Sequence, residues 1–72
     1  MEPCGNWLKA ARQNKGISQI ELAKILNVHP VSVNRWEHGV RNPSLSMIYK
    51  IADIMGMTVS ELLNFDNVVI VK

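Results

Sequence analysis

The sequence predicts an all-α fold, a compact bundle of five short helices, and three observations support this prediction. Apolar residues recur at helical spacing in four separate segments. A Ser or Thr followed three residues later by Glu opens two of the helices, and Gly or Asn follows the end of four of them. The 72 residues are 47% apolar, enough for one small core. We assign residues 1–66 to this domain and 67–72 to a C-terminal tail.

The first two helices are delimited by short polar signals. The first is expected at residues 6–15, with Asn6 as its N-cap and Gly16 as the left-handed residue that ends it. Its inward side is formed by Trp7, Leu8 and Ala11. The second helix is expected at residues 19–26. A capping box precedes it, made of Ser18 and Glu21.

A sharp turn joins the second helix to a third. Asn27 suits a left-handed turn conformation. His29 must be extended because Pro30 follows it, and Pro30 is favoured as the first residue of a new helix. The third helix therefore runs over residues 30–38, and Gly39 ends it.

A helical period of 3.6 residues sorts the side chains of this third helix onto two faces. The inward positions are Val33, Trp36 and Val40, with Glu37 at their edge. The outward positions are Val31, Asn34, Arg35 and His38. In a DNA major groove, arginine can pair with guanine, asparagine with adenine, and valine can meet the thymine methyl group. An ordinary solvated face is the alternative interpretation, since exposed polar residues are the norm.

Two further helices and an apolar tail complete the chain. Ser44 is expected to cap a helix at residues 45–55 that Gly56 ends. A second capping box opens a short fifth helix and is made of Thr58 and Glu61. Residues 68–71 are β-prone, so the fold leaves room for a short C-terminal β-strand. That strand would either pack back near Trp7 or pair with its copy in a second chain.

Charge and composition exclude several classes of protein. Residues 9–41 carry a local charge of +4 within a net charge of +2, which suits a polyanion, although solvated charged faces are commoner than binding sites. Cys4 has no partner for an internal disulfide, and the two histidines lack the further ligands of a zinc site. We expect a cytoplasmic protein with no metal, no other cofactor and no membrane span. No arrangement of nucleophile and base or phosphate loop suggests an enzyme.

A set of residues spread over most of the chain forms a specific pattern. It comprises Gly16-Ile17-Ser18-Gln19, Leu22-Ala23, Val28, Val33, Arg35-Trp36-Glu37, Gly39, Asn42-Pro43-Ser44-Leu45, Ile51-Ala52 and Gly56. With this pattern, residues 8–63 resemble the phage-repressor and Cro type of helix-turn-helix domain. The resemblance implies a five-helix bundle that binds operator DNA, with the second helix of the motif in the major groove.

The resemblance also implies roles for individual residues. The positions that match base-reading residues are Val31, Ser32, Asn34 and Arg35, with Pro30 beside them. The positions that match phosphate contacts, or that lie near phosphates, are Gln19, His29, Arg41, Asn42 and Ser44. Arg12 and Glu37 match a buried ion pair that ties the first helix to the third. The ordinary alternatives are an exposed first-turn role for Gln19 and surface positions for Arg12 and Glu37.

Three residues at the turn depart from the family pattern. Asn27 replaces the usual turn glycine, a change that costs little. His29 stands where a Ser or Thr usually caps the third helix. It would either cap the amide of Ser32 or, when protonated in acidic solution, pair with a phosphate. Pro30 replaces a hydrogen-bonding side chain, which removes one contact to a base.

The function that the sequence favours is sequence-specific binding of double-stranded DNA by a small transcriptional regulator. We expect a repressor that occludes a palindromic operator as a homodimer, with the 67–72 tail and the fifth helix in the dimer interface. The alternative is a protein-interaction module, such as an antitoxin or adaptor, for which DNA binding is secondary. An exposed Trp7, the apolar tail and Pro30 favour that alternative.

Overall fold

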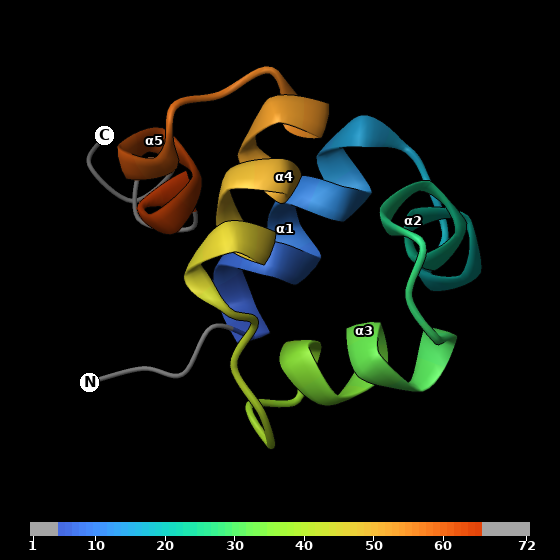
Figure 1. The fold of residues 1–72 in the computed structure, drawn as a ribbon. Helices are drawn as coiled ribbons and strands as arrows, with labels where there is room; N and C mark the ends of the chain where they lie inside the picture. The colour runs from blue at the N-terminus through green and yellow to red at the C-terminus, as the bar shows by residue number, and fades with distance from the viewer. Residues whose placement is uncertain (1–4, 66–72) are drawn as a thin grey trace.

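The computed structural model describes residues 5–65, and this part of the chain contains five α-helices and no strand (Figure 1). The helices are α1 (Gly5–Lys15), α2 (Gln19–Leu26), α3 (Pro30–Glu37), α4 (Leu45–Met55) and α5 (Val59–Leu63). The predicted all-α bundle of five helices is therefore confirmed. Cys4, the domain boundary after residue 66 and the predicted strand at 68–71 lie outside the described residues.

Local hydrogen bonds set the helix boundaries that the sequence predicts. At α2, the backbone N–H of Glu21 donates to Ser18 Oγ at 3.0 Å, and the Ser18 N–H donates to Glu21 Oε1 at 2.7 Å. Thr58 and Glu61 make the same reciprocal pair at α5, at 3.1 and 2.9 Å. Both predicted capping boxes are confirmed. Each satisfies two N–H groups that would otherwise have no partner at a helix start.

Two details of the helix boundaries were predicted wrongly. The first helix begins at Gly5, so Asn6 lies inside its first turn and is not the N-cap. The third helix ends at Glu37, one residue early, and the chain then turns through Gly39 at a φ of +73°. This turn carries Val40 away from the inward face, where helical periodicity had placed it, and leaves its side chain 69% exposed.

All five helices contribute side chains to one core. In Figure 1, α1 and α4 cross in the middle, with α5 on one side and α2 and α3 on the other. Helix α1 contacts α3, α4 and α5, while α2 packs against α3. The buried side chains are Trp7, Leu8, Ala11, Leu22, Ala23, Leu26, Val33, Trp36, Ile51, Ala52 and Leu62. Burial of each large apolar side chain contributes roughly 1.5–3 kcal/mol relative to exposure.

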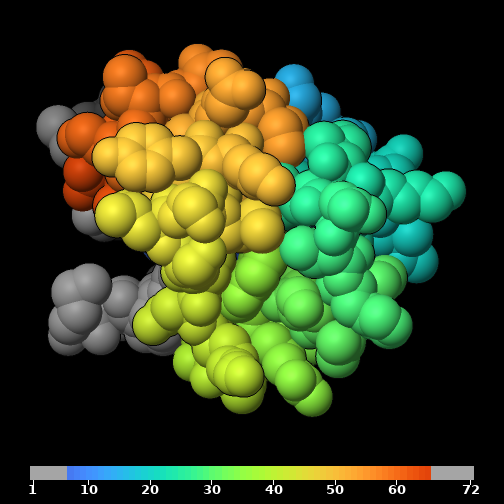
Figure 2. Space-filling view, in the orientation of Figure 1, coloured from blue at the N-terminus to red at the C-terminus, as the bar shows by residue number. Residues whose placement is uncertain are grey.

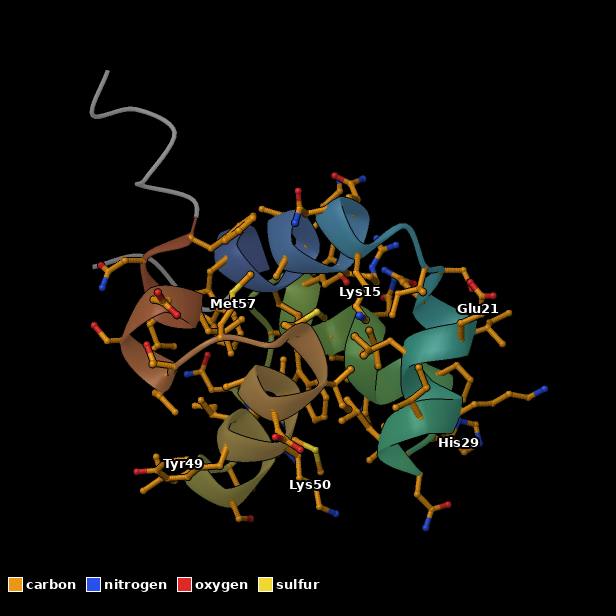
Figure 3. All side chains as sticks on the ribbon, turned by 90° about the horizontal axis from the view of Figure 1, so that it is seen from above. Lys15, Glu21, His29, Tyr49, Lys50 and Met57 are labelled. Atoms are coloured by element: carbon orange, nitrogen blue, oxygen red, sulfur yellow. The ribbon has the colours of Figure 1, made fainter. Side chains whose placement is uncertain are left out.

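The structure corrects two expectations about apolar exposure. Trp7 is 8% exposed and belongs to the core. This agrees with its predicted place on the inward side of the first helix, and the exposed Trp7 on which the protein-interaction alternative relied is wrong. Helix α4 buries Ile51 and Ala52, but Leu45 in its first turn is 64% exposed. Tyr49, one turn later, also points away from the bundle (Figure 3). The repeat of apolar residues in this helix begins at Leu45 and predicts a buried side chain there, so that expectation is wrong for Leu45. Tyr49 is not part of the repeat, and together with Leu45 it gives the first half of α4 an exposed apolar side.

The capping box at α2 makes stability depend on pH through Glu21. The Ser18 backbone N–H, and then the Ser18 hydroxyl, hold the pKa of the Glu21 carboxyl below its ordinary value. The pKa of Glu21 is thus lower in the folded protein than in the unfolded chain. The ionised carboxylate therefore stabilises the fold at pH values above the ordinary pKa, and this contribution is lost as the pH falls through the pKa of the folded state.

We therefore expect Glu21→Gln to lower stability at about pH 7 and to have no effect at about pH 2. Urea unfolding midpoints of the two proteins at both pH values measure this difference. Equal loss of stability at both pH values would contradict a role for the charge.

Candidate nucleic-acid interface

The turn between α2 and α3 has the geometry that its sequence predicts. Asn27 adopts the left-handed conformation with a φ of +59°, and its N–H donates to the Lys24 carbonyl at 3.1 Å. The Val28 N–H donates to the Ala23 carbonyl at 2.9 Å, and the half-buried Val28 side chain packs against the core. Ala23 is itself buried in the core, and α2 packs against α3. These contacts fix the angle between the two helices.

The start of α3 differs from one of the sequence predictions. His29 is extended and Pro30 is the first helical residue, as predicted. The His29 side chain makes no capping hydrogen bond, so the predicted side-chain cap of Ser32 is wrong. The His29 backbone carbonyl instead accepts the Ser32 N–H at 2.9 Å. The imidazole is exposed, and its contact with a phosphate remains a prediction.

Helix α3 has a buried face and a solvent face. Val33 and Trp36 are buried in the core. The predicted base readers lie on the other side, with Ser32 half-buried and the rest exposed: Val31, Asn34 and Arg35. In Figure 2, α2 and α3 form one continuous surface along an edge of the molecule. A short helix that presents donors, acceptors and one apolar side chain in this way has the chemistry needed to contact base edges.

A charged pair joins α1 to the end of α3. Arg12 Nε donates to Glu37 Oε2 at 2.6 Å, and a terminal guanidinium nitrogen donates to Oε1 at 3.1 Å. The other terminal nitrogen donates to the Ile17 carbonyl at 2.8 Å. The Arg12 and Glu37 side chains are 12% and 2% exposed. The guanidinium thus satisfies the carboxylate in two places while it also holds the chain that leads into α2.

Gln19 and Asn34 extend this pair to the surface. Gln19 Nε2 donates to Glu37 Oε1 at 3.0 Å, and Asn34 Nδ2 donates to Gln19 Oε1 at 3.4 Å. The structure therefore brings together a predicted phosphate contact, a predicted base reader and the predicted ion pair. Sequence analysis missed this connection, because the linked residues lie 15 and 18 positions apart. The one signal was a carboxylate at the edge of the inward face, with more acceptor sites than one arginine fills.

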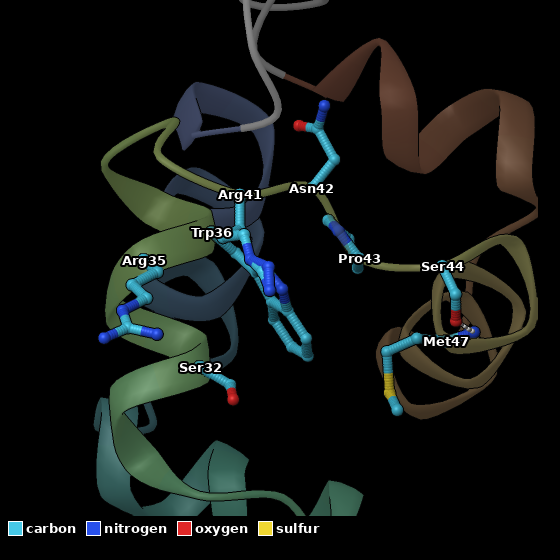
Figure 4. A pocket seen from close by; sticks show the side chains of 8 residues that line it. All are labelled: Ser32, Arg35, Trp36, Arg41, Asn42, Pro43, Ser44 and Met47. Carbon is cyan, nitrogen blue, oxygen red and sulfur yellow. Dashed lines mark hydrogen bonds between the residues drawn. The ribbon is translucent and has the colours of Figure 1, made fainter.

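A cleft lies between α3 and the start of α4 (Figure 4). Ser32 and Arg35 line it from α3, and Trp36 and Met47 form apolar parts of its wall. The predicted phosphate contacts Arg41, Asn42 and Ser44 line it too, next to the buried Pro43. Ser44 caps α4, since its Oγ accepts the Met47 N–H at 3.2 Å. Predicted base readers and predicted phosphate contacts therefore share one concave surface.

The described residues contain neither a cluster suited to a metal ion nor a helix suited to a membrane. Over residues 5–65, no group of three or more His, Cys, Asp or Glu side chains could hold a metal ion. None of the five described helices combines the length and the apolar character that crossing a membrane requires.

Two short helices joined by a left-handed turn, the second with a polar outer face, define a helix-turn-helix domain. Comparison with known families agrees, since the helix-turn-helix family profile matches residues 8–62. The chain belongs to this family, and the resemblance seen in the sequence is confirmed.

One relative adds a functional description. The chain is 35% identical over 60 residues to a protein of Archaeoglobus fulgidus described as an uncharacterized HTH-type transcriptional regulator. The aligned region covers 83% of this chain and 86% of that protein. No solved structure matches the chain.

The enclosed ion pair yields a test by double substitution. Arg12→Met should lower the free energy of unfolding by about 3 kcal/mol or more, because it leaves the Glu37 carboxylate enclosed without its cation. Arg12→Met combined with Glu37→Leu should recover most of that loss, since no charge then remains to be desolvated. Urea denaturation of the single and double variants measures both values. Losses that simply add would show that the two groups do not act as a pair.

Proposed function

We propose that this protein binds double-stranded DNA in a sequence-specific manner and regulates transcription, acting as a repressor that occludes its operator. The observation that carries the proposal is the solvent face of α3, which presents Asn34 and Arg35. Arg35 also lines a cleft together with Arg41 and Asn42. Membership of the helix-turn-helix family and the description of the Archaeoglobus fulgidus relative as a transcriptional regulator support it. The family is typically non-enzymatic, in agreement with the expectation that this protein is not an enzyme.

In the proposed complex, α3 lies in the major groove and its neighbours contact the backbone. Arg35 would donate to guanine O6 and N7, and Val31 would contact a thymine methyl group. The cleft residues and the start of α2 would contact phosphates on either side of the groove, which fixes the register of α3 without reading sequence. Repression by occlusion then requires only that the domain occupy a promoter.

The alternative of a protein-interaction module loses one of its three supports. Trp7 is buried in the core, so it is not available to a protein partner. The second support, the apolar tail at 68–71, lies outside the described residues. The third, Pro30, is equally suited to start the recognition helix of a DNA-binding domain. DNA binding therefore remains the function that we propose.

Arg35 should contribute specificity. Arg35→Ala is expected to cost on the order of 1–3 kcal/mol on the preferred site and to relax the preference at one base pair, because a bidentate contact to guanine is lost. Selection of bound sites from random DNA would first define the preferred site. Titration of that site and of random duplexes then compares the variant with the native protein.

Arg41 is the matched control, because it is the other arginine of the cleft and is assigned to a phosphate. Arg41→Ala should weaken binding to all sequences by a similar factor and reduce the slope of log affinity against log salt by about 1. If Arg35→Ala lowered specific and random affinity equally, Arg35 would be a phosphate contact. If native protein selected no site at all, the proposed function would be wrong.

We propose further that the protein binds a palindromic operator as a homodimer. Two-fold pairing would place two α3 helices about one DNA turn apart. Exposed Leu63 on α5 is available to such an interface. Deletion of residues 67–72 should therefore weaken self-association, since it removes the four consecutive apolar residues of the tail. Sedimentation equilibrium measures the change, and an unaltered dimer mass would exclude the tail from the interface.

A further inference from the structure

We infer that Glu37 fixes the donor and acceptor ends of two surface amides, those of Gln19 and Asn34, and thereby makes Asn34 a reader of adenine in one orientation of the base pair. Glu37 is thus a positioning residue for sequence recognition as well as the partner of Arg12. This inference rests on the proposed DNA-binding function.

Glu37 is the acidic partner of Arg12. Arg12 is a donor only, and it contacts both carboxylate oxygens, at 2.6 and 3.1 Å. Both side chains are almost enclosed, so each charge is stable there only because the opposite charge lies beside it. An ionised carboxylate accepts hydrogen bonds and cannot donate them. Any third group on Glu37 must therefore be a donor.

The Gln19 amide is the donor that contacts Glu37 from α2. Its Nε2 donates to Glu37 Oε1 at 3.0 Å, and a flipped amide would instead place Oε1 against the carboxylate. That arrangement would set two acceptors against each other in a poorly solvated place, so it is excluded. The Gln19 carbonyl oxygen must consequently face the other way, toward Asn34.

The orientation of Gln19 in turn fixes the orientation of the Asn34 amide. Its neighbour offers an acceptor, so Asn34 presents Nδ2, and the two atoms lie 3.4 Å apart. Asn34 is exposed on the outer face of α3, where Oδ1 and the second Nδ2 hydrogen are accessible. One acceptor beside one donor complements the N6 donor and N7 acceptor of adenine. Guanine offers two acceptors at these places, so its O6 would face Oδ1 without a hydrogen bond.

Fixed polarity gives specificity that a freely turning amide lacks. A free asparagine can exchange its donor and acceptor ends by rotation and so adapt to a base pair in either orientation. The series of hydrogen bonds from Arg12 through Glu37 and Gln19 removes this freedom from Asn34. Each group in the series can form its hydrogen bond with the next group in only one orientation. Glutamine at position 37 would restore it, since an amide can donate or accept.

The test compares base preference at a single pair of the selected site. Asn34→Ala identifies the pair, and four duplexes that differ only there are titrated with each protein. The native protein should prefer adenine over the other bases by on the order of tenfold to a hundredfold. Glu37→Gln should reduce that ratio several-fold while its affinity for random DNA stays within about twofold of native.

Arg12→Lys is the matched control for damage to the ion pair. Lysine keeps the positive charge but loses the two-pronged contact, so the fold is weakened while Glu37 remains an acceptor. This variant should keep the native adenine ratio at a temperature where circular dichroism shows all proteins folded. Gln19→Met provides a second test if Glu37→Gln fails to fold, because it interrupts the amide contacts and leaves the ion pair intact. It should also reduce the adenine ratio.

A readout without DNA separates this inference from the proposed function. In the free protein, Glu37→Gln should shift the side-chain amide resonances of both Gln19 and Asn34 in ¹⁵N–¹H spectra, whereas Arg12→Lys should leave the Asn34 resonances in place. Unmoved Asn34 resonances in Glu37→Gln would overturn the inference whatever the protein binds.

The inference about Glu37 would be wrong if Glu37→Gln kept the native preference for adenine. It would also be wrong if Arg12→Lys lost that preference to the same extent as Glu37→Gln. Sequence-specific DNA binding would stand in both cases. Failure of Asn34→Ala to affect any base pair would likewise overturn the inference about Glu37 alone. Selection of no site by native protein would overturn both proposals.

Discussion

The carboxylate of Glu37 is where three helices meet. Glu37 lies on α3, and its side chain is 2% exposed. Its carboxylate accepts hydrogen bonds from Arg12 on α1 and from Gln19 on α2. Removal of such a charge pair from water offsets most of the attraction between the charges, so the pair adds little net stability. The ion pair constrains geometry more than it adds stability. Arg12 and Gln19 can reach the carboxylate only if α3 has one particular orientation about its own axis. The outer face of α3 follows from that rotation.

The apolar side of α3 requires the same rotation by independent means. Val33 and Trp36 are three residues apart, share one face and enter the core. Asn34 and Arg35 must then face solvent, whatever their chemistry. Because the core and the ion pair agree, the proposed base readers are held by a rigid helix and not by a flexible loop. A reading surface of this kind loses little conformational entropy when it binds.

Features that depend on neighbouring residues could be predicted from the sequence. The capping box at Ser18, the left-handed Asn27 and the start of α3 at Pro30 are each specified within four residues, and the structure has them all. Features that depend on tertiary packing could not. Periodicity placed Val40 inward because it takes no account of the turn at Gly39, and it cannot show that the two halves of α4 face different surroundings. The contact of Gln19 with Glu37 needs α2 and α3 to be docked first.

Under the proposed function, the dipeptide His29-Pro30 influences which part of α3 contacts the bases. Proline has no N–H, so one of the donors that a cap must satisfy at a helix start is absent, and the His29 side chain makes no cap. Pro30 also gives the first helical position no hydrogen-bonding side chain. Under the proposed function, Val31 and Ser32 still lie near the bases at the start of the helix, but the two-pronged hydrogen bonds to base edges come from Asn34 and Arg35, one turn further along. That turn is the part of α3 that the contacts from Glu37 through Gln19 reach, so the loss of a reader at the start of the helix coincides with added support at its centre.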